Sequence, residues 1–157
     1  MILKKIHFAI DKTIKADASQ KILLKRYRNY SPNQSNVIVV IGGDGFMLET
    51  LKKYKKYKKP FYGMNRGSFG FLMNKFKTKN IKKHILKAKQ VTISPLEMHA
   101  ITKNNVKKSA IAINEVSLLR QSRQAASLQV LKGKRVLIKK LICDGVLVAT
   151  PAGSTAY

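Results

Sequence analysis

The sequence predicts an α/β N-terminal domain over residues 1–90, with a parallel sheet and helices, followed by a β-rich domain over residues 91–157. Two observations predict this fold class. Up to Gln90, short β-branched runs alternate with segments of helical periodicity, which is typical of strands joined by helices in a parallel sheet. After Gln90 the helical segments stop and five strand-like segments follow one another. Such a succession indicates antiparallel β structure.

The first domain contains three expected strands, each followed by an expected helix. Val37–Ile41 is an uninterrupted apolar run that ends in glycine, which favours a strand buried on both faces. Pro60 ends the second helix, because proline lacks the N–H that a helix interior needs. The expected strands are Lys5–Ile10, Val37–Ile41 and Phe61–Met64; the expected helices are Ala16–Tyr30, Phe46–Tyr57 and Thr78–Ala88, with Ile22, Leu23, Tyr27, Met47, Leu51, Tyr54, Ile81 and Ile85 as their inward apolar residues.

The second domain contains only strand-like segments with alternating or β-branched residues. Lys132–Gly133 fits a hairpin turn, although it lacks the Asn-Gly pair that is typical of one. The strands are too few to cover both faces of a two-sheet sandwich, so we expect an incomplete, antiparallel β-sandwich-like domain. The expected strands are Val91–Ile101, Ser109–Leu119, Ala126–Leu131, Lys134–Ile138 and Leu141–Ala149.

A glycine-rich turn, Gly42–Gly45, follows the buried strand and carries Asp44. Glycine has no Cβ, so a phosphate group can approach the N–H groups of such a turn closely. The carboxyl end of a strand is also where open α/β sheets bind their ligands. This turn alone indicates nucleotide or phosphate chemistry and no more, since lipid kinases and phosphofructokinases share it. The alternative is that Asp44 only caps the following helix.

Three further segments accompany the GGDG turn: NRGSFGFL at Asn65–Leu72, the pair Asn114–Glu115, and DGVLVATPAGSTAY at Asp144–Tyr157. In this order the four segments closely resemble the signatures of the NAD kinase family, over nearly the whole chain. Ala152 stands where the family usually has Thr or Ser, so a hydrogen bond from that hydroxyl is absent. The chain also stops at Tyr157, inside the last motif, whereas the family continues for a further stretch.

The resemblance implies an α/β nucleotide-binding domain followed by a β-sandwich domain, with the active site between them. It implies phosphorylation of the 2′-hydroxyl of the adenosine ribose of NAD, which gives NADP. The phosphate donor is ATP or inorganic polyphosphate, with Mg²⁺ or another divalent metal bound to ATP. The resemblance also implies a homo-oligomer. Because the family's remaining segment is absent, we expect residues 1–157 alone to be poorly soluble or partly unfolded and to lack detectable activity.

The resemblance also assigns roles to individual residues. Asp44 matches the carboxylate that accepts the proton of the hydroxyl, and Gly45 belongs to the same ligand loop. Phe71 matches an aromatic that lines the adenine pocket, whereas Phe69 is expected to pack; the alternative is that both belong to the core. Asp144 matches a residue that contacts the other nucleoside of NAD.

The remaining assignments fall in the second domain. Asn114 and Glu115 lie on the expected strand Ser109–Leu119, and by resemblance they hydrogen-bond the dinucleotide. Their side chains point to opposite faces unless a bulge intervenes, and the alternative is a bulge or strand-end pair that satisfies backbone groups. The residues that match adenine contacts are Thr155, Ala156 and Tyr157.

The chain is strongly basic, with 32 Lys+Arg against 7 Asp+Glu and a formal net charge of +25. This charge raises a second interpretation, a nucleic-acid-binding module, whose binding would weaken steeply with salt. The basic residues are spread through the whole sequence, which a general compositional drift would also produce. A third interpretation is an inactive truncated remnant of an NAD kinase.

Other features bound the setting of the protein. Cys143 is the single cysteine, so no intramolecular disulfide is expected, and a reducing cytoplasm fits. The three histidines are scattered without zinc-site spacing, so no protein-held metal site is expected. There is no apolar segment of membrane-spanning length and no signal peptide, so we expect a cytoplasmic protein without a membrane partner.

Overall fold

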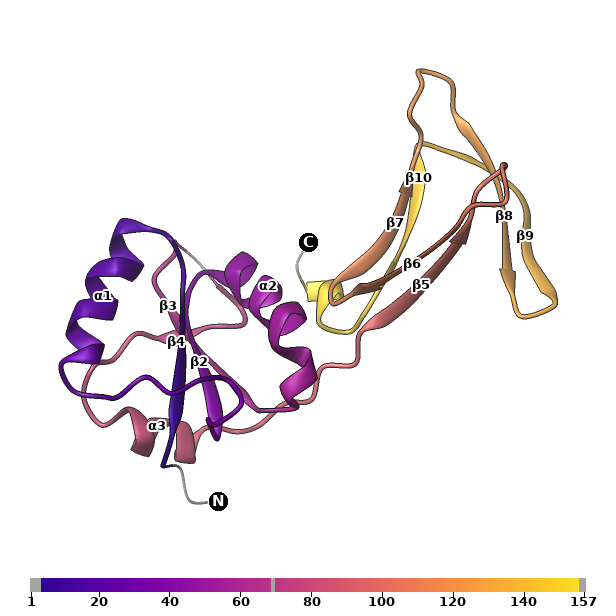
Figure 1. Cartoon of the computed structure of the whole chain (residues 1–157). Coiled ribbons are helices and arrows are strands. Elements are labelled where there is room, and N and C mark those ends of the chain that lie inside the picture. The colour runs from indigo at the N-terminus through magenta and orange to yellow at the C-terminus, as the bar shows by residue number, and fades with distance from the viewer. Residues whose placement is uncertain (1–3, 69, 156–157) are drawn as a thin grey trace. The chain divides into compact units, whose positions relative to one another are not determined.

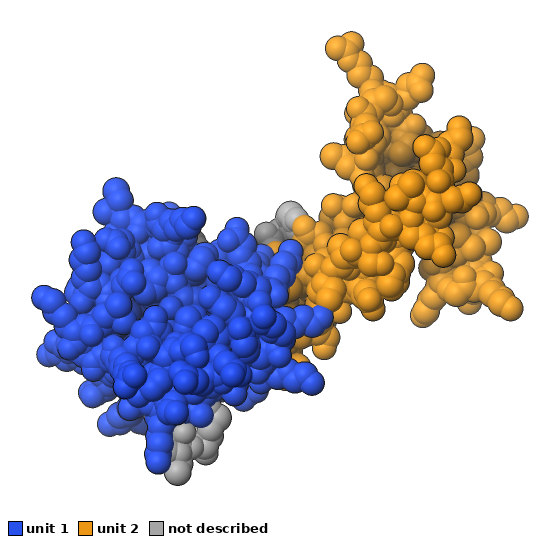
Figure 2. All heavy atoms as spheres, in the orientation of Figure 1, with its two compact units in different colours: residues 1–90 blue, residues 91–157 orange. Residues whose placement is uncertain are grey.

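The structure, a computed structural model, describes residues 4–68 and 70–155. The chain divides into two compact units, residues 1–90 (unit 1) and residues 91–157 (unit 2). Figure 2 shows the two units in different colours. Unit 1 contains a parallel sheet with helices, and the strands of unit 2 pair antiparallel. The fold class that the sequence predicts is therefore confirmed.

Unit 1 is built on a four-stranded parallel sheet in the order β1-β2-β3-β4. Every residue of β2 is buried, because this strand lies inside the sheet and both of its faces are covered. The short strand β4 extends the sheet beyond β3 and was not expected from the sequence. The strands are β1 (Ile6–Ile10), β2 (Val37–Gly42), β3 (Phe61–Asn65) and β4 (Asn74–Lys75).

Helices pack on both faces of this sheet (Figure 1). Alternate strand residues point to opposite faces, so two separate core clusters form. One joins Phe8, Val39 and Ile41 to α1 and α3, and the other joins Ile38 and Val40 to α2. The helices are α1 (Ile14–Leu24), α2 (Asp44–Tyr54) and α3 (Ile81–Lys87), and a 3-10 turn, η1 (Lys55–Tyr57), follows α2.

The first helix is shorter than its sequence pattern predicts. It ends at Leu24 instead of Tyr30, because the following residues pair with the free edge of β1: Tyr30 N–H donates to Ile6 O at 3.0 Å, and Asn29 Oδ1 accepts Phe8 N–H at 2.9 Å. These long-range bonds outweigh local helical periodicity. Ile22, expected to face inward, is 43% exposed.

Unit 2 consists of three two-stranded antiparallel sheets. The expected strand Ser109–Leu119 is divided, because the chain bends at residues 113–114. A second division falls at Asp144, between β9 and β10, instead of before Leu141. The pairs are β5 (Leu96–Ile101) with β6 (Lys107–Ala112), β7 (Glu115–Leu119) with β10 (Gly145–Ala149), and β8 (Ala126–Lys132) with β9 (Arg135–Cys143); the 3-10 turn η2 (Gly153–Thr155) follows β10.

The described part of unit 2 has little buried core. Ile113, Thr150 and Gly153 are its buried residues, and large apolar side chains are exposed on all three sheets. A two-stranded sheet covers neither of its faces, so its stability depends on packing against other elements. The exposed apolar side chains on these strands are Ile101, Ile111, Leu118, Leu119, Leu131, Val136, Leu137, Ile138, Ile142, Leu147 and Val148.

Candidate active site

The first part of the site is the turn that joins β2 to α2. Gly43 is the N-cap of α2 and Asp44 is its first residue, so the Asp44 carboxylate lies at the positive end of the helix dipole. Gly42 has no room for a side chain: a Cβ there would lie 2.9 Å from the Phe46 ring and 3.0 Å from Asp11 Cβ. A side chain at position 42 would therefore force Phe46 to shift.

The Asp44 carboxylate bonds a distant loop. Its Oδ2 accepts the N–H of Phe71 at 2.7 Å, and its Oδ1 accepts the N–H of Leu72 at 3.2 Å. The N-cap residue of α2 is Gly43, and no side-chain hydrogen bond caps this helix. The alternative in which Asp44 only caps α2 is therefore wrong, and two backbone donors fix the orientation of the carboxylate.

The loop Asn65–Leu72 packs its backbone against the same glycine turn. Arg66 N–H donates to Gly42 O at 2.8 Å, and Asn65 Oδ1 accepts the N–H of Gly67 at 2.8 Å. A Cβ on Gly67 would approach Gly43 Cα to 3.1 Å, which is closer than most real Cβ contacts. Gly67, the first glycine of the loop, thus allows the two backbones to meet.

Gly70 and Phe71 complete the contact with Asp44. A Cβ on Gly70 would lie 2.6 Å from Asp44 Oδ1, so only glycine fits beside the carboxylate. Phe71 presents its N–H to Asp44, while its side chain is 81% exposed. The alternative in which Phe71 is a core residue is wrong. Phe69 lies outside the described residues.

A positive charge is anchored in this loop. Arg66 Nε donates to the buried Ser19 Oγ at 2.6 Å, and the guanidinium lies 4.2 Å from the centroid of the Phe76 ring. Ser19 Oγ in turn donates to Lys15 O at 2.7 Å. The side chain of Arg66 is therefore held by α1 and by the segment after β4.

In unit 2, the turn after β10 packs on the bend between β6 and β7. Thr150 is 3% exposed; its N–H donates to Asn114 O at 2.7 Å and its Oγ1 donates to Ile113 O at 2.6 Å. The same Oγ1 accepts the N–H of Gly153 at 3.0 Å. A Cβ on Gly153 would overlap Asn114 O, so glycine is required there.

Asn114 and Glu115 do not share a strand. Asn114 lies in the bend and Glu115 is the first residue of β7. The expectation that both lie on one regular strand is wrong, because the ladder of β6 ends at Ala112 and that of β7 begins at Glu115. Both side chains are partly buried, and the Asn114 backbone bonds described above place the pair beside the TPAGS turn.

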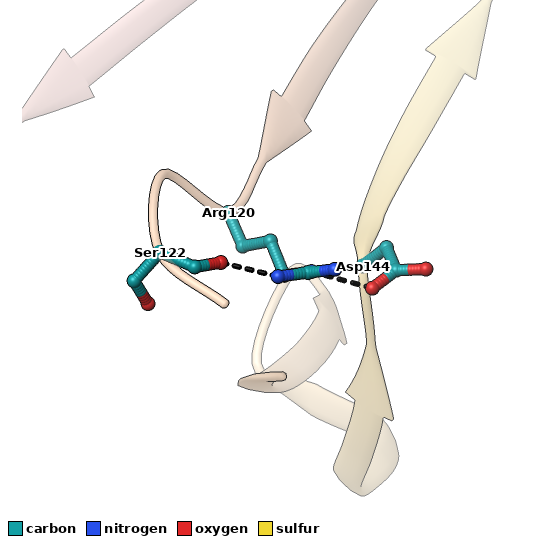
Figure 3. Close-up of polar contacts among 3 residues, drawn as sticks. All are labelled: Arg120, Ser122 and Asp144. Carbon is teal, nitrogen blue, oxygen red and sulfur yellow. Dashed lines mark hydrogen bonds and ion pairs between the residues drawn. The ribbon is translucent and has the colours of Figure 1, made fainter. Parts of the chain in front are cut away.

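Asp144 lies between β9 and β10 and pairs with Arg120, the residue after β7. Arg120 Nε donates to Asp144 Oδ1 at 2.5 Å, and Arg120 Nη1 donates to Ser122 O (Figure 3). The backbones also pair, since Arg120 N–H donates to Asp144 O at 2.9 Å. A Cβ on the next residue, Gly145, would overlap Leu118 O, so β7 and β10 approach closely at this point.

The other residues predicted for the site are less fully described. Gly45 is exposed in the first turn of α2, with open space where a Cβ would stand. Thr155 ends the 3-10 turn η2. Ala156 and Tyr157 lie outside the described residues. The structure thus brings Asp44 and Phe71 together in unit 1, and it places Asn114, Glu115, Asp144 and Thr155 in unit 2.

Two further properties of the described residues bear on chemistry: the pKa of one partly buried phenol and the grouping of side chains that could bind a metal. Burial raises the pKa of the Tyr62 phenol, which packs against the core cluster beneath α1. Over residues 4–68 and 70–155, no three His, Cys, Asp or Glu side chains gather where they could hold a metal ion. Within the same ranges, no helix is long and apolar enough to cross a membrane.

Three residues that have structural roles near the predicted site residues were not identified from the sequence. Thr150 and Gly70 stand inside the motif segments, and a buried hydroxyl or a required glycine is visible only once the facing backbone is known. Arg120 is one of many basic residues, so composition gives it no distinction. Its position beyond Leu119, at the end of an expected strand, was the one available signal.

The parallel sheet with a glycine-flanked carboxylate at the carboxyl end of β2 is typical of α/β proteins that bind nucleotides or phosphates. Family comparison is more specific: the ATP-NAD kinase N-terminal domain matches residues 4–91, and the ATP-NAD kinase C-terminal domain matches residues 113–157. The chain belongs to the NAD kinase family.

Curated relatives agree with this assignment. The chain is 48% identical over 152 residues to an NAD kinase of Brucella suis and 50% identical over 131 residues to an NAD kinase of Rhizobium meliloti. These matches cover 97% and 83% of this chain, but 59% and 51% of the relatives, so the chain spans between half and three-fifths of their length. A crystal structure of yeast NADH kinase complexed with NADH is similar with a TM-score of 0.75 at 22% identity, covering 99% of this chain and 56% of that one, which supports the fold.

Proposed function

We propose that this chain is an NAD kinase-like phosphotransferase, which phosphorylates the 2′-hydroxyl of the adenosine ribose of NAD to give NADP. Its membership of the family and the names of its relatives support this activity. The single structural observation that carries the proposal is the Asp44 carboxylate, held by the N–H groups of Phe71 and Leu72 at the carboxyl end of β2. A carboxylate fixed in one orientation suits proton transfer to a defined atom.

The proposed reaction needs an activated alcohol. Asp44 accepts the proton of the 2′-hydroxyl while the bond from that oxygen to phosphorus forms and the bond from phosphorus to the leaving phosphate oxygen breaks. The donor leaves as ADP, or as a polyphosphate one unit shorter. Because phosphoryl transfer depends mainly on alignment and on stabilising charge, holding the carboxylate in place is a direct contribution to the rate.

The remaining proposed roles concern binding of NAD. The exposed ring of Phe71 is available to stack on the adenine. Gly45 lies in the first turn of α2, whose N–H groups favour a phosphate. Asp144 contacts the hydroxyls of the second nucleoside. The residues proposed to bind the adenine and its ribose are Asn114, Glu115, Thr155, Ala156 and Tyr157.

A divalent metal is proposed to enter with the phosphate donor, ATP or polyphosphate. In this proposal the phosphate oxygens of the donor hold the metal. Mg²⁺ is commonly bound in this way, and it would neutralise charge on the transferred group. A homo-oligomer is proposed on family grounds alone, and a cytoplasmic location is proposed because the single cysteine, Cys143, fits a reducing compartment.

The test replaces Asp44 by Asn and measures NADP formed from NAD with ATP or polyphosphate. The assay is run on the 157-residue chain and on the same chain joined to the C-terminal part of the Brucella suis relative that lies beyond the match. Asn keeps the size of the side chain but not its proton affinity, so turnover should fall about 10²–10⁴-fold while NAD affinity stays within a few-fold.

Asp17→Asn is the matched control, because Asp17 is an exposed carboxylate of the same unit, paired with Lys21 at 3.3 Å. It should leave turnover unchanged. Near-normal turnover by Asp44→Asn would reject the proton-acceptor role, and absence of NADP in both wild-type forms would reject the proposed function.

A further inference from the structure

The inference concerns Arg120, to which neither the sequence motifs nor the family comparison gives a role. Arg120 follows β7 and Asp144 precedes β10, and their backbones pair one step beyond the Gly145–Leu119 register of the two strands. A Cβ on Gly145 would overlap Leu118 O, so glycine is required where the two strands approach each other. The Cα atoms of Arg120 and Asp144 are thus fixed relative to each other by the sheet.

The Arg120 side chain adds a second constraint. Its Nε donates to Asp144 Oδ1 at 2.5 Å, and its Nη1 is held by Ser122 O. With donors engaged on two sides, the planar guanidinium cannot rotate away from Asp144 without losing a bond. Figure 3 shows this arrangement, with the second carboxylate oxygen on the side away from the guanidinium.

The free oxygen of Asp144 is available to a ligand. The Asp144 side chain is 77% exposed, whereas that of Arg120 is 32% exposed. Among residues 4–68 and 70–155, Arg120 is the residue that donates a hydrogen bond to the Asp144 carboxylate, and this bond engages Oδ1. An exposed aspartate without such a partner samples several rotamers, and ordering it on binding costs affinity.

Charge gives a second reason for the pair. NAD carries a diphosphate, and a lone carboxylate near it raises the free energy of the complex by repulsion. The Arg120 guanidinium offsets the charge of Asp144 while leaving one oxygen to accept hydrogen bonds from hydroxyl groups. A neutral pair with a free acceptor suits a ribose next to a phosphate better than an isolated carboxylate does.

We propose that Arg120 is a positioning residue, which orients the Asp144 carboxylate and neutralises its charge so that Oδ2 accepts hydrogen bonds from the second nucleoside of NAD. This proposal rests on the proposed function, because it assumes that Asp144 contacts that nucleoside. Arg120 acts through Asp144 and does not itself bind the ligand.

The test measures dissociation constants for NAD and for ADP, which lacks the second nucleoside, on the 157-residue chain and on the same chain joined to the C-terminal part of the Brucella suis relative. Arg120→Met should weaken NAD binding about three- to fivefold, the scale of a partly exposed ion pair, and leave ADP binding unchanged. In the Asp144→Asn background, Arg120→Met should have no further effect on NAD, since two residues that act through one contact are not additive. Arg120→Lys should restore part of the loss, because lysine keeps the charge but not the planar fork.

Arg123→Met is the control. Arg123 lies three residues after Arg120 and is exposed, so the substitution removes the same positive charge from a nearby position. It should leave both dissociation constants unchanged. Equal weakening of NAD and ADP by Arg120→Met, or additive effects with Asp144→Asn, would show a structural role and overturn the proposal. Unchanged NAD binding by Arg120→Met would overturn it as well. Absence of NAD binding by both wild-type forms would reject the proposed function, and this proposal with it.

Discussion

Replacing Gly70 by alanine should separate the Asn65–Leu72 loop from Asp44. The new Cβ would lie 2.6 Å from Asp44 Oδ1 and 3.3 Å from Met73 Cγ, whereas non-bonded atoms pack at about 3.5–4.0 Å. Either the carboxylate or the loop must therefore move by a substantial part of an ångström. Such a movement breaks or lengthens the two bonds from Phe71 N–H and Leu72 N–H to Asp44.

The size of the effect follows from those two bonds. Hydrogen bonds to a charged group contribute about 1.5–3 kcal/mol each, and the partial exposure of this site lowers that value. We expect Gly70→Ala to reduce the unfolding free energy of unit 1 by about 1–3 kcal/mol in total. Turnover should fall about 10²-fold, because small misplacements of a catalytic group have effects of this size.

Two measurements check the expectation. Urea unfolding gives the stability change, and amide hydrogen exchange at residues 71 and 72 reports the two bonds directly. Gly45→Ala is the stability control, since a Cβ on Gly45 meets nothing within 4 Å and alanine favours a helix. In an Asp44→Ala background, where the Oδ atoms are gone, Gly70→Ala should cost markedly less.

The reasoning would be refuted by a Gly70→Ala chain that is as stable as Gly45→Ala and keeps slow exchange at both amides. That result would mean that the loop accommodates a methyl group without releasing Asp44. An equal loss of stability in the presence and absence of the Asp44 carboxylate would refute it in another way, since the clash would then lie elsewhere, at Met73.

Two other substitutions give clear expectations. Phe71→Ala should weaken NAD binding by about 1–3 kcal/mol, the contribution of one base–aromatic stack. The melting temperature should change little, because Phe71 is 81% exposed. A large fall in melting temperature with unchanged affinity would contradict this expectation. Thr150→Val should destabilise unit 2 by about 1–3 kcal/mol and speed exchange of the Gly153 amide, because Ile113 O and Gly153 N–H lose their hydroxyl partner. Thr150→Ser should restore slow exchange of the Gly153 amide. Unaltered exchange in Thr150→Val would show that the bond from Gly153 N–H to Thr150 Oγ1 does not protect this amide.

The sequence predicted the elements whose pattern is local. The buried strand β2 and the inward face of α2, with Met47 and Leu51, follow from β-branched runs and helical spacing alone. Competition from distant partners explains where prediction failed. Asn29 and Tyr30 leave the expected helix to pair with β1, and no local pattern contains that information.

The candidate site was predicted in part for the same reason. Glycines and an acid in one turn identify Asp44 as a residue with chemistry, but the sequence does not show which donors hold it. The breaks of the strands in unit 2, at Asn114 and at Asp144, are also not visible in a run of strand-like residues. Both breaks fall on residues that the family resemblance assigns to ligand binding.

That coincidence has a physical basis. Where a strand ends, its backbone N–H and C=O groups lose their ladder partners and need others. Asp44 supplies acceptors to the loop after β3, and Thr150 bonds the bend after β6. The same motif side chain thus satisfies the backbone at a break and shapes the surface that the break exposes.

Loss of function in a variant of such a residue therefore has two sources, a missing ligand contact and a relaxed backbone. The Asp44 carboxylate illustrates both, since it accepts two N–H groups and is the proposed proton acceptor. Substitutions that keep the backbone bonds while altering the chemistry, or the reverse, are needed to separate the two. Asp44→Asn removes the proton affinity at constant size and keeps one acceptor oxygen for the two N–H groups, whereas Gly70→Ala displaces the carboxylate at constant proton chemistry. If Gly70→Ala frees the amides of both residues 71 and 72, and Asp44→Asn frees only the amide that faces its NH2 group but lowers turnover more, the carboxylate has a chemical role beyond holding the loop.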